Sequence, residues 1–201
     1  MGISPSKSLE TLKGSITSFG TASGHRFVIG DWETSPIGRF TDVMWAPPDS
    51  RRILVASERA ASYITNVYPF SEFIHTEVSA HLDGQKIEVI AGPLAIKLAS
   101  GQPIPFPWRP RWVTGSLESA LAQRIMGVRT NGVSPTGATE WYRTRSLSWI
   151  KQSRATVDGD SCGELAPISG HLGFGFTEPP RRPSHVKLRV DILPRPPTHS
   201  R

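Results

Sequence analysis

Glycine and proline interrupt this sequence so often that its folded elements have to be short. The chain has 18 glycines and 18 prolines among 201 residues, and its apolar residues fall into short runs between them. This spacing is unfavourable for a helical bundle and typical of a domain built from many short strands. The length allows one domain with a substantial core, or at most two small ones.

The stretch from Arg26 to Ser57 shows the pattern most clearly. Three apolar runs alternate there with two turn signals that contain proline or glycine, which predicts three successive strands with tight connections. The runs are Phe27–Ile29, Phe40–Ala46 and Ile53–Ala56, and the turn signals are Ser35–Gly38 and Pro47–Ser50.

Two helices are predicted among the strands. The first begins at Ser57, a good N-cap followed by Glu58, and ends before Pro69. The second covers residues 116–126 and stops at Gly127. The remaining strands are predicted at Phe73–Ala80, Gln85–Ile90, Leu94–Leu98, Thr139–Arg143, Ser146–Val157, Leu172–Phe176 and Ser184–Leu193.

Three local patterns make these predictions more specific. Asp83-Gly84 predicts a hairpin turn between two strands. In Arg39–Pro47 the residues alternate, with Phe40, Asp42, Met44 and Ala46 on one face and Thr41, Val43 and Trp45 on the other. Ser184–Leu193 also alternates, which predicts a half-exposed strand with Lys187, Arg189 and Asp191 on the face opposite its apolar residues.

The resulting fold class is mainly β (α+β). We expect a strongly curved antiparallel sheet or an open β-barrel with two covering helices, formed by a single β-rich domain over residues 25–193. Residues 1–24 are polar and rich in serine, and are predicted to form a flexible N-terminal arm. Residues 194–201 are predicted to form a tail rich in proline and arginine.

Charged and aromatic residues inside predicted strands are the candidate site. An inward-facing charge needs a partner, so a carboxylate and an arginine beside aromatic rings form a plausible anchor for a small acidic or polar ligand. The alternatives are an ion pair that stabilises the barrel or faces water, and an enzyme that uses Asp42 or Glu140 as an acid or base. The candidate residues are Asp42, Arg129, Glu140, Trp141, Tyr142 and Arg143.

The excess of basic over acidic residues suggests a second kind of function, the binding of a polyanion. Lysine and arginine exceed aspartate and glutamate by 23 − 17 = 6, which favours polyanionic partners or serves solubility alone. Arginine and tryptophan alternate with proline in residues 102–113, a segment that we interpret as a ligand for another domain or, preferably, as a loop folded over the domain. Nucleic acid is a less favoured partner than a small molecule, because no RNP-type strand, helix-turn-helix or long basic run is present.

Several kinds of site are not indicated. Cys162 is the one cysteine, which excludes an intrachain disulfide and favours a reducing, cytoplasmic location. No apolar run approaches the roughly 20 residues of a membrane span. No cofactor is predicted, and no metal site either, although three strands could bring His75, His171 and His185 together. Oligomeric state leaves no signal in the sequence.

The segments GDWETSPIGRFTDVMW, RRILVAS, GVRTNG, EWYRTRSLSWI and LGFGFTEPPRRPSHVKLRV together resemble a family of small proteins of high-GC Gram-positive bacteria with no established activity. That resemblance covers Arg26 to Ile192 and implies a soluble intracellular protein. The motif Ser35-Pro36-Ile37-Gly38-Arg39-Phe40 is also similar to the acetoacetate-decarboxylase-like β folds. The lysine motif of that family is absent here, so the resemblance does not imply decarboxylation through a Schiff base.

Overall fold

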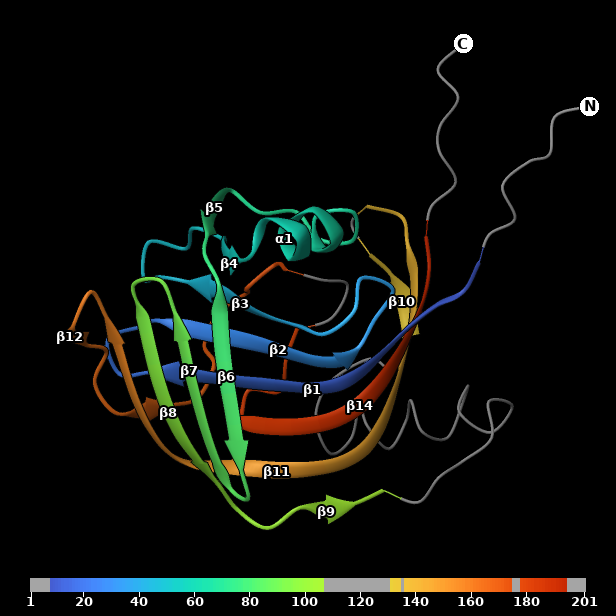
Figure 1. Cartoon of the computed structure of the whole chain (residues 1–201). Helices are drawn as coiled ribbons and strands as arrows, with labels where there is room; N and C mark the ends of the chain where they lie inside the picture. Colours follow the sequence, from blue (N-terminus) through green and yellow to red (C-terminus); the bar gives the residue numbers. More distant parts are fainter. Residues whose placement is uncertain (1–7, 107–130, 135, 175–177, 195–201) are drawn as a thin grey trace, which may run out of the picture.

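The computed structural model describes residues 8–106, 131–134, 136–174 and 178–194. In this part of the chain, strands form one strongly curled, mostly antiparallel sheet, accompanied by a single helix, α1 (Glu58–Ile64) (Figure 1). The strands are β1 (Glu10–Thr21), β2 (Arg26–Thr34), β3 (Phe40–Ala46), β4 (Ile53–Ala56), β5 (Glu72–His75), β6 (Val78–Asp83), β7 (Lys86–Ala91), β8 (Leu94–Ser100), β9 (Ile104–Pro105), β10 (Asn131–Val133), β11 (Thr139–Val157), β12 (Asp160–Ser161), β13 (Leu165–Ala166) and β14 (Ser184–Leu193). The predicted mainly β class with a curved sheet is confirmed.

Along the sheet the strand order is β5-β4-β3-β2-β1-β14-β11-β8-β7-β6. The strands β9, β10 and β12 are additional partners of β11, and β13 pairs with β1. The curl brings β6 close to β3, so that the two ends of the order approach each other (Figure 1). The second helix predicted over residues 116–126 lies outside the described residues. No helix in the described part has the length and hydropathy needed to cross a bilayer.

The three strands predicted between Arg26 and Ser57 are confirmed as β2, β3 and β4, which pair antiparallel in sequence. The predicted cap of α1 is also confirmed, because the Ser57 side chain accepts the N–H of Ala60. After the helix the chain returns as β5, parallel to β4. The single strand predicted over Phe73–Ala80 is divided, since β5 ends at His75 and β6 starts at Val78.

The hairpin predicted around Asp83-Gly84 joins β6 to β7, and Gly84 has the positive φ of 57° that such a turn requires. The strands predicted at Thr139–Arg143 and Ser146–Val157 are one continuous strand, β11. A register shift between Thr144 and Ser146 marks the place where a break was expected. Because β11 pairs with β14 over its first half and with β8 over its second, it joins the two parts of the sheet.

Two predictions about local structure are wrong. The arm expected over residues 1–24 contains β1, which lies in the middle of the sheet between β2 and β14. Leu172 to Phe174, the described part of the strand expected over Leu172–Phe176, is irregular instead. The Glu178 carboxylate accepts the N–H groups of Leu172 and Gly173 there, at 2.9 and 3.0 Å. These bonds to a side chain replace the backbone pairing of a strand.

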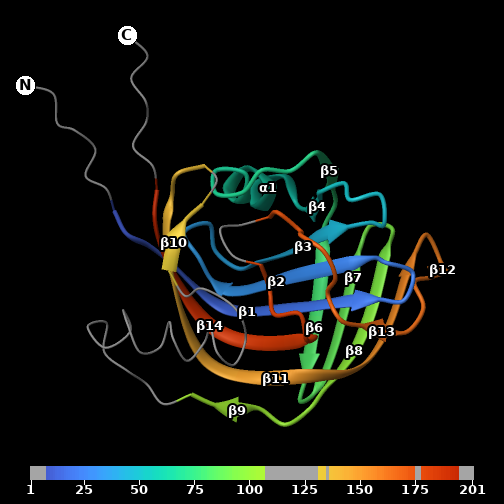
Figure 2. The same ribbon diagram turned by 180° about the vertical axis from the view of Figure 1, so that it is seen from behind.

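The sheet carries a hydrophobic core on each face. The barrel face of β1–β4 packs against β7, β8 and the second half of β11, with Phe27, Val43 and Trp45 among its buried side chains. The helix face packs against α1 and includes Trp32 and Phe40. Figure 1 shows α1 above β3 and β4, whereas β6, β7 and β8 cross in front of them, and Figure 2 shows the same layers from behind.

The alternation predicted for β3 follows these two faces. Val43 and Trp45 belong to the barrel-face core, and Phe40 and Met44 belong to the helix-face core. Asp42 lies between Phe40 and Met44 on the helix face. This carboxylate therefore points away from the interior of the barrel and into the packing beneath α1.

Candidate functional site

Glu140 is the most deeply buried carboxylate of the candidate site. It lies in β11, opposite Ile192 of β14, and its exposed fraction is 0%. Two tyrosines approach one of its oxygens. The Tyr68 hydroxyl, from the turn that follows α1, donates to Oε2 at 2.5 Å, and the Tyr142 hydroxyl, from the same face of β11, donates at 2.7 Å. We call Glu140, Tyr68 and Tyr142 the tyrosine–carboxylate cluster.

The three oxygens of the cluster form a closed ring. The two tyrosine hydroxyls are themselves 2.7 Å apart. Burial raises the pKa of both tyrosines well above 10, so both phenols keep their protons near neutral pH. Burial also raises the pKa of the Glu140 carboxyl, whereas the hydrogen bonds from the two tyrosines lower it.

The other oxygen of Glu140 is left without a partner. Oε1 is buried and accepts no hydrogen bond within the described part of the chain. Because both tyrosines donate to Oε2, Oε1 is the oxygen that remains as an acceptor. The cluster therefore presents one unsatisfied acceptor beside two aromatic rings.

A second tyrosine–carboxylate contact lies on the same face of the sheet. Tyr63 of α1 donates its hydroxyl to Oε2 of Glu10 at 2.8 Å. Glu10 in β1 is opposite Ile192, and Ile192 is in turn opposite Glu140. One strand thus separates the two residues, which places their Cα atoms about 10 Å apart. Burial, and then the bond to Glu10, raises the pKa of Tyr63.

Asp42 has an apolar environment with one polar contact. Its exposed fraction is 1%, and the Trp32 indole N–H donates to Oδ1 at 3.2 Å. Oδ2 has no partner among the described residues. Burial raises the pKa of Asp42 to about 7. Gly30 lies beneath this pair, and a Cβ there would be 2.5 Å from Oδ1 of Asp42 and 2.6 Å from Nε1 of Trp32.

The structure divides the predicted site residues between the two faces of the sheet. Glu140 and Tyr142 lie on the helix face, together with Asp42 of β3. Trp141 and Arg143 point the other way, because neighbouring residues of a strand alternate. Arg143 forms its ion pair with Asp191 of β14 and not with Asp42 or Glu140. Arg129 lies outside the described residues.

Two members of the buried polar set were missed by the sequence analysis. Tyr68 lies at the end of the predicted helix, next to Pro69, and gave no signal of its own. Asp191 was expected on the exposed face of its strand, but its exposed fraction is 0%, and Arg189 binds it at 2.9 Å. Its position in a strand beside Lys187 and Arg189 was a signal for an ion pair, but not for burial.

The histidines do not form a metal site in the described part of the chain. His185 contacts Thr17, with 2.8 Å between Nδ1 and Oγ1, and burial lowers its pKa to about 4. His171 pairs with Glu178 instead, at 2.7 Å. Among the described residues, no three histidine, cysteine, aspartate or glutamate side chains lie where they could share a metal ion.

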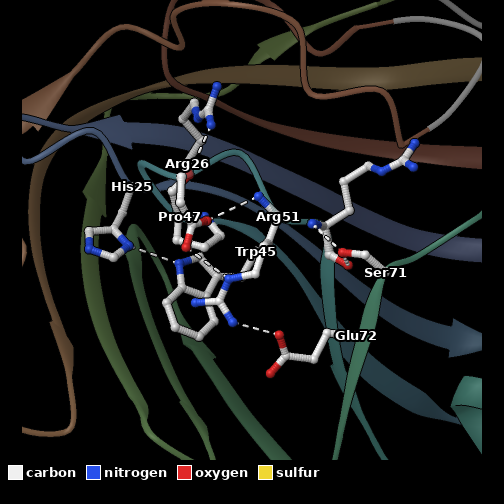
Figure 3. A network of polar contacts seen from close by, with 9 residues as sticks. His25, Arg26, Trp45, Pro47, Arg51, Ser71 and Glu72 are labelled. Atoms are coloured by element: carbon white, nitrogen blue, oxygen red, sulfur yellow. Dashed lines mark hydrogen bonds and ion pairs between the residues drawn. The ribbon is translucent and has the colours of Figure 1, made fainter.

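A further polar network lies where β2 begins and β3 ends, and it connects the loops there (Figure 3). The Trp45 indole donates to Nδ1 of His25 at 2.9 Å, and the buried Arg26 guanidinium donates to the carbonyl of Pro47 at 3.0 Å. Arg51 pairs with Glu72 on the surface, at 2.6 Å. Most of these groups bind one another or loop carbonyls, although the buried Nε of Arg26 has no partner among the described residues. We assign the network to loop closure.

Two solved structures are similar to this chain over most of its length. A crystal structure of acetoacetate decarboxylase from Legionella pneumophila subsp. pneumophila str. Philadelphia 1 has a TM-score of 0.48 and 8% sequence identity, covering 96% of this chain and 88% of that one. A second structure, from structural studies of acetoacetate decarboxylase, has a TM-score of 0.44 and 11% identity, covering 93% and 85%.

No protein-family model and no curated protein matches the sequence. The resemblance to a family of high-GC Gram-positive bacteria therefore has no support from these comparisons.

Proposed function

We propose that this protein is a small-ligand-binding domain whose polar anchor is the tyrosine–carboxylate cluster. The observation that carries the proposal is Oε1 of Glu140, a buried acceptor with no partner among the described residues. Buried polar atoms nearly always have a hydrogen-bond partner, and leaving one without a partner costs about 1–3 kcal/mol. A ligand that donates to Oε1 would recover that free energy.

The surroundings of Glu140 restrict the chemistry of the ligand. Since Oε1 accepts, the ligand has to bring an N–H or O–H group. Ala138 and Ile192 belong to the same core as the two tyrosine rings, so the rest of the ligand is apolar. We therefore expect a small amide, amine or alcohol with a hydrocarbon body, and not a carboxylate.

Three probes of similar size test this expectation. Propionamide and propylamine carry donors, whereas propionate offers acceptors alone. The full-length protein is titrated with each, and its thermal unfolding midpoint is recorded. Both donor probes should raise the midpoint with increasing concentration, because a ligand that binds the folded state alone stabilises it. Propionate should leave the midpoint unchanged.

Two variants separate binding at Oε1 from other effects. Glu140→Gln should abolish the response to the donor probes, because its carbonyl oxygen would accept from the two tyrosine hydroxyls and its amide nitrogen, a donor, would take the place of Oε1. Tyr63→Phe, which removes a tyrosine hydroxyl bonded to Glu10 in the same core, should retain it. Equal responses to propionate and propionamide in the wild type, or no response to either donor probe, would overturn the proposal and assign Oε1 to a buried water.

Acid–base catalysis is a second candidate, favoured by Asp42. A pKa of about 7 is close to that of a general base working near neutrality. A catalytic carboxyl has to be reachable, so Asp42 of the folded protein should couple to an amine in the presence of a carbodiimide. Peptide mapping would locate the label. Modification of Asp42 only after unfolding would assign it to the core and remove this candidate.

A further inference from the structure

Basic side chains line up across three neighbouring strands on the barrel face of the sheet. Lys13 of β1 is directly opposite Arg189 of β14, and Arg189 is directly opposite Arg143 of β11. Directly opposed residues share a face. Lys187 lies two residues before Arg189 and therefore points the same way. We call Lys13, Lys187, Arg189 and Arg143 the basic row.

The two arginines of the row are bound to one carboxylate. Arg143 and Arg189 both donate to Asp191, which is fully buried beneath them, and Thr11 donates to it at 2.7 Å. The ion pairs with Asp191 hold both guanidinium groups in place, and Arg189 also donates to the Thr11 hydroxyl at 3.1 Å. One carboxylate does not balance two guanidinium groups, so this part of the row keeps a positive charge.

The two lysines of the row carry further positive charge. Lys13 and Lys187 are exposed, and neither forms an ion pair within the described part of the chain. Neighbouring strands are about 4.8 Å apart, and like charges directly opposite each other destabilise a sheet. An anion bound from outside would remove this repulsion.

The other carboxylates nearby do not serve as that anion. Asp31 of β2 is buried, accepts the Thr41 hydroxyl at 2.8 Å and lies 3.8 Å from Arg39. Glu33, exposed near the end of β2, makes no ion pair with a described residue. The row therefore has a net positive charge that the described part of the protein does not neutralise.

An aromatic ring completes the surface. Trp141 is directly opposite Asp191 and shares the face of Arg143, two residues further along β11. It is half-buried, so part of its side chain stays accessible. Cations that hold phosphates next to a ring on which a base can stack are the combination that binds single-stranded nucleic acid. We propose that the basic row and Trp141 bind a single nucleic-acid strand, independently of the ligand proposed for Glu140.

The test uses exposed lysines, whose replacement leaves the buried contacts intact. Binding of a labelled oligothymidylate of about 12 nucleotides is measured by fluorescence anisotropy over a range of salt concentrations. The row variant is Lys13→Gln with Lys187→Gln. The matched control is Lys86→Gln with Lys151→Gln, which removes the same charge from two exposed lysines outside the row.

We expect the wild type and the control to bind with the same salt dependence. In the row variant the slope of log K against log salt should fall by about 1.4, since each phosphate contact with a single strand contributes about 0.7. Trp141→Leu should weaken binding at least about fivefold while leaving the slope unchanged.

Three results would overturn the proposal. The first is the absence of binding by the wild type, and the second is an equal loss in the row variant and the control. The third is equal competition by heparin or by a DNA duplex, which would show a general polyanion contact without a role for an unpaired base.

Discussion

Asp42 makes a quantitative prediction about how stability depends on pH. Its pKa is about 7 in the folded protein and 3.8 in the reference state that represents the unfolded chain. Between these values the folded state holds a proton that the unfolded state has lost. The free energy of unfolding therefore falls as pH rises through this range. The stabilisation is complete below pH 3.8 and is lost above the folded pKa.

The size of the effect follows from the two pKa values. At about 1.4 kcal/mol per pH unit, the whole interval corresponds to about 4 kcal/mol. About 2.6 kcal/mol of this falls between about pH 5 and about pH 8, where the experiment is practical. Asp42→Asn removes the titration and keeps the size of the side chain, and its carbonyl oxygen can still accept the Trp32 indole N–H. The amide nitrogen then takes the place of Oδ2. This changes the free energy of unfolding by a constant amount that does not depend on pH.

Urea unfolding of the wild type and of Asp42→Asn at several pH values measures the difference directly. Other titrating groups, Glu140 included, act equally on both proteins, so they cancel in the difference. The variant should gain about 2.6 kcal/mol relative to the wild type between about pH 5 and about pH 8. Parallel stability curves would show that Asp42 ionises with its ordinary pKa, and the reasoning from its burial would be refuted.

Two further predictions concern the neighbours of this core. Gly30→Ala should destabilise the protein by about 1–3 kcal/mol in urea unfolding, because the added Cβ would displace Asp42 or Trp32; an unchanged midpoint would mean that the indole moves freely. For His185, the folded pKa of about 4 lies below the ordinary 6.5, so the unfolded chain binds the extra proton and stability falls as pH drops from about 6.5 to about 4. An NMR titration should find its imidazole neutral at about pH 5, and a protonated ring there would contradict its burial.

Local signals accounted for most of the strands. The alternation of Ser184–Leu193 and the Asp83-Gly84 turn depend on neighbouring residues, and both are found where the sequence predicted them. The N-cap at Ser57 is equally local. In contrast, β1 has the sequence ETLKGSITSFGT, in which serine, threonine and glycine hide any two-residue period. Its stability as a strand comes from pairing with β2 and β14 on both sides.

The candidate site also depends on contacts between distant strands, which local sequence signals do not predict. Glu140 and Tyr142 were selected because polar and aromatic residues lie together in one strand. Alternation along that strand separates Arg143 from both of them. The true partner of Arg143, Asp191, is 48 residues away in the sequence, and the register between β11 and β14 decides that pairing. A single sequence carries no signal for such a register.

The position of β14 has a consequence for how the protein is made. This last strand is inserted between β1, the first strand, and β11. Until β14 leaves the ribosome, β1 and β11 each have an edge with unpaired N–H and C=O groups, which is a template for wrong association. Contacts that close such long loops form slowly. The nascent chain should therefore depend on chaperones until β14 has been synthesised, and deleting Ser184–Leu193 should abolish folding altogether rather than weaken one edge.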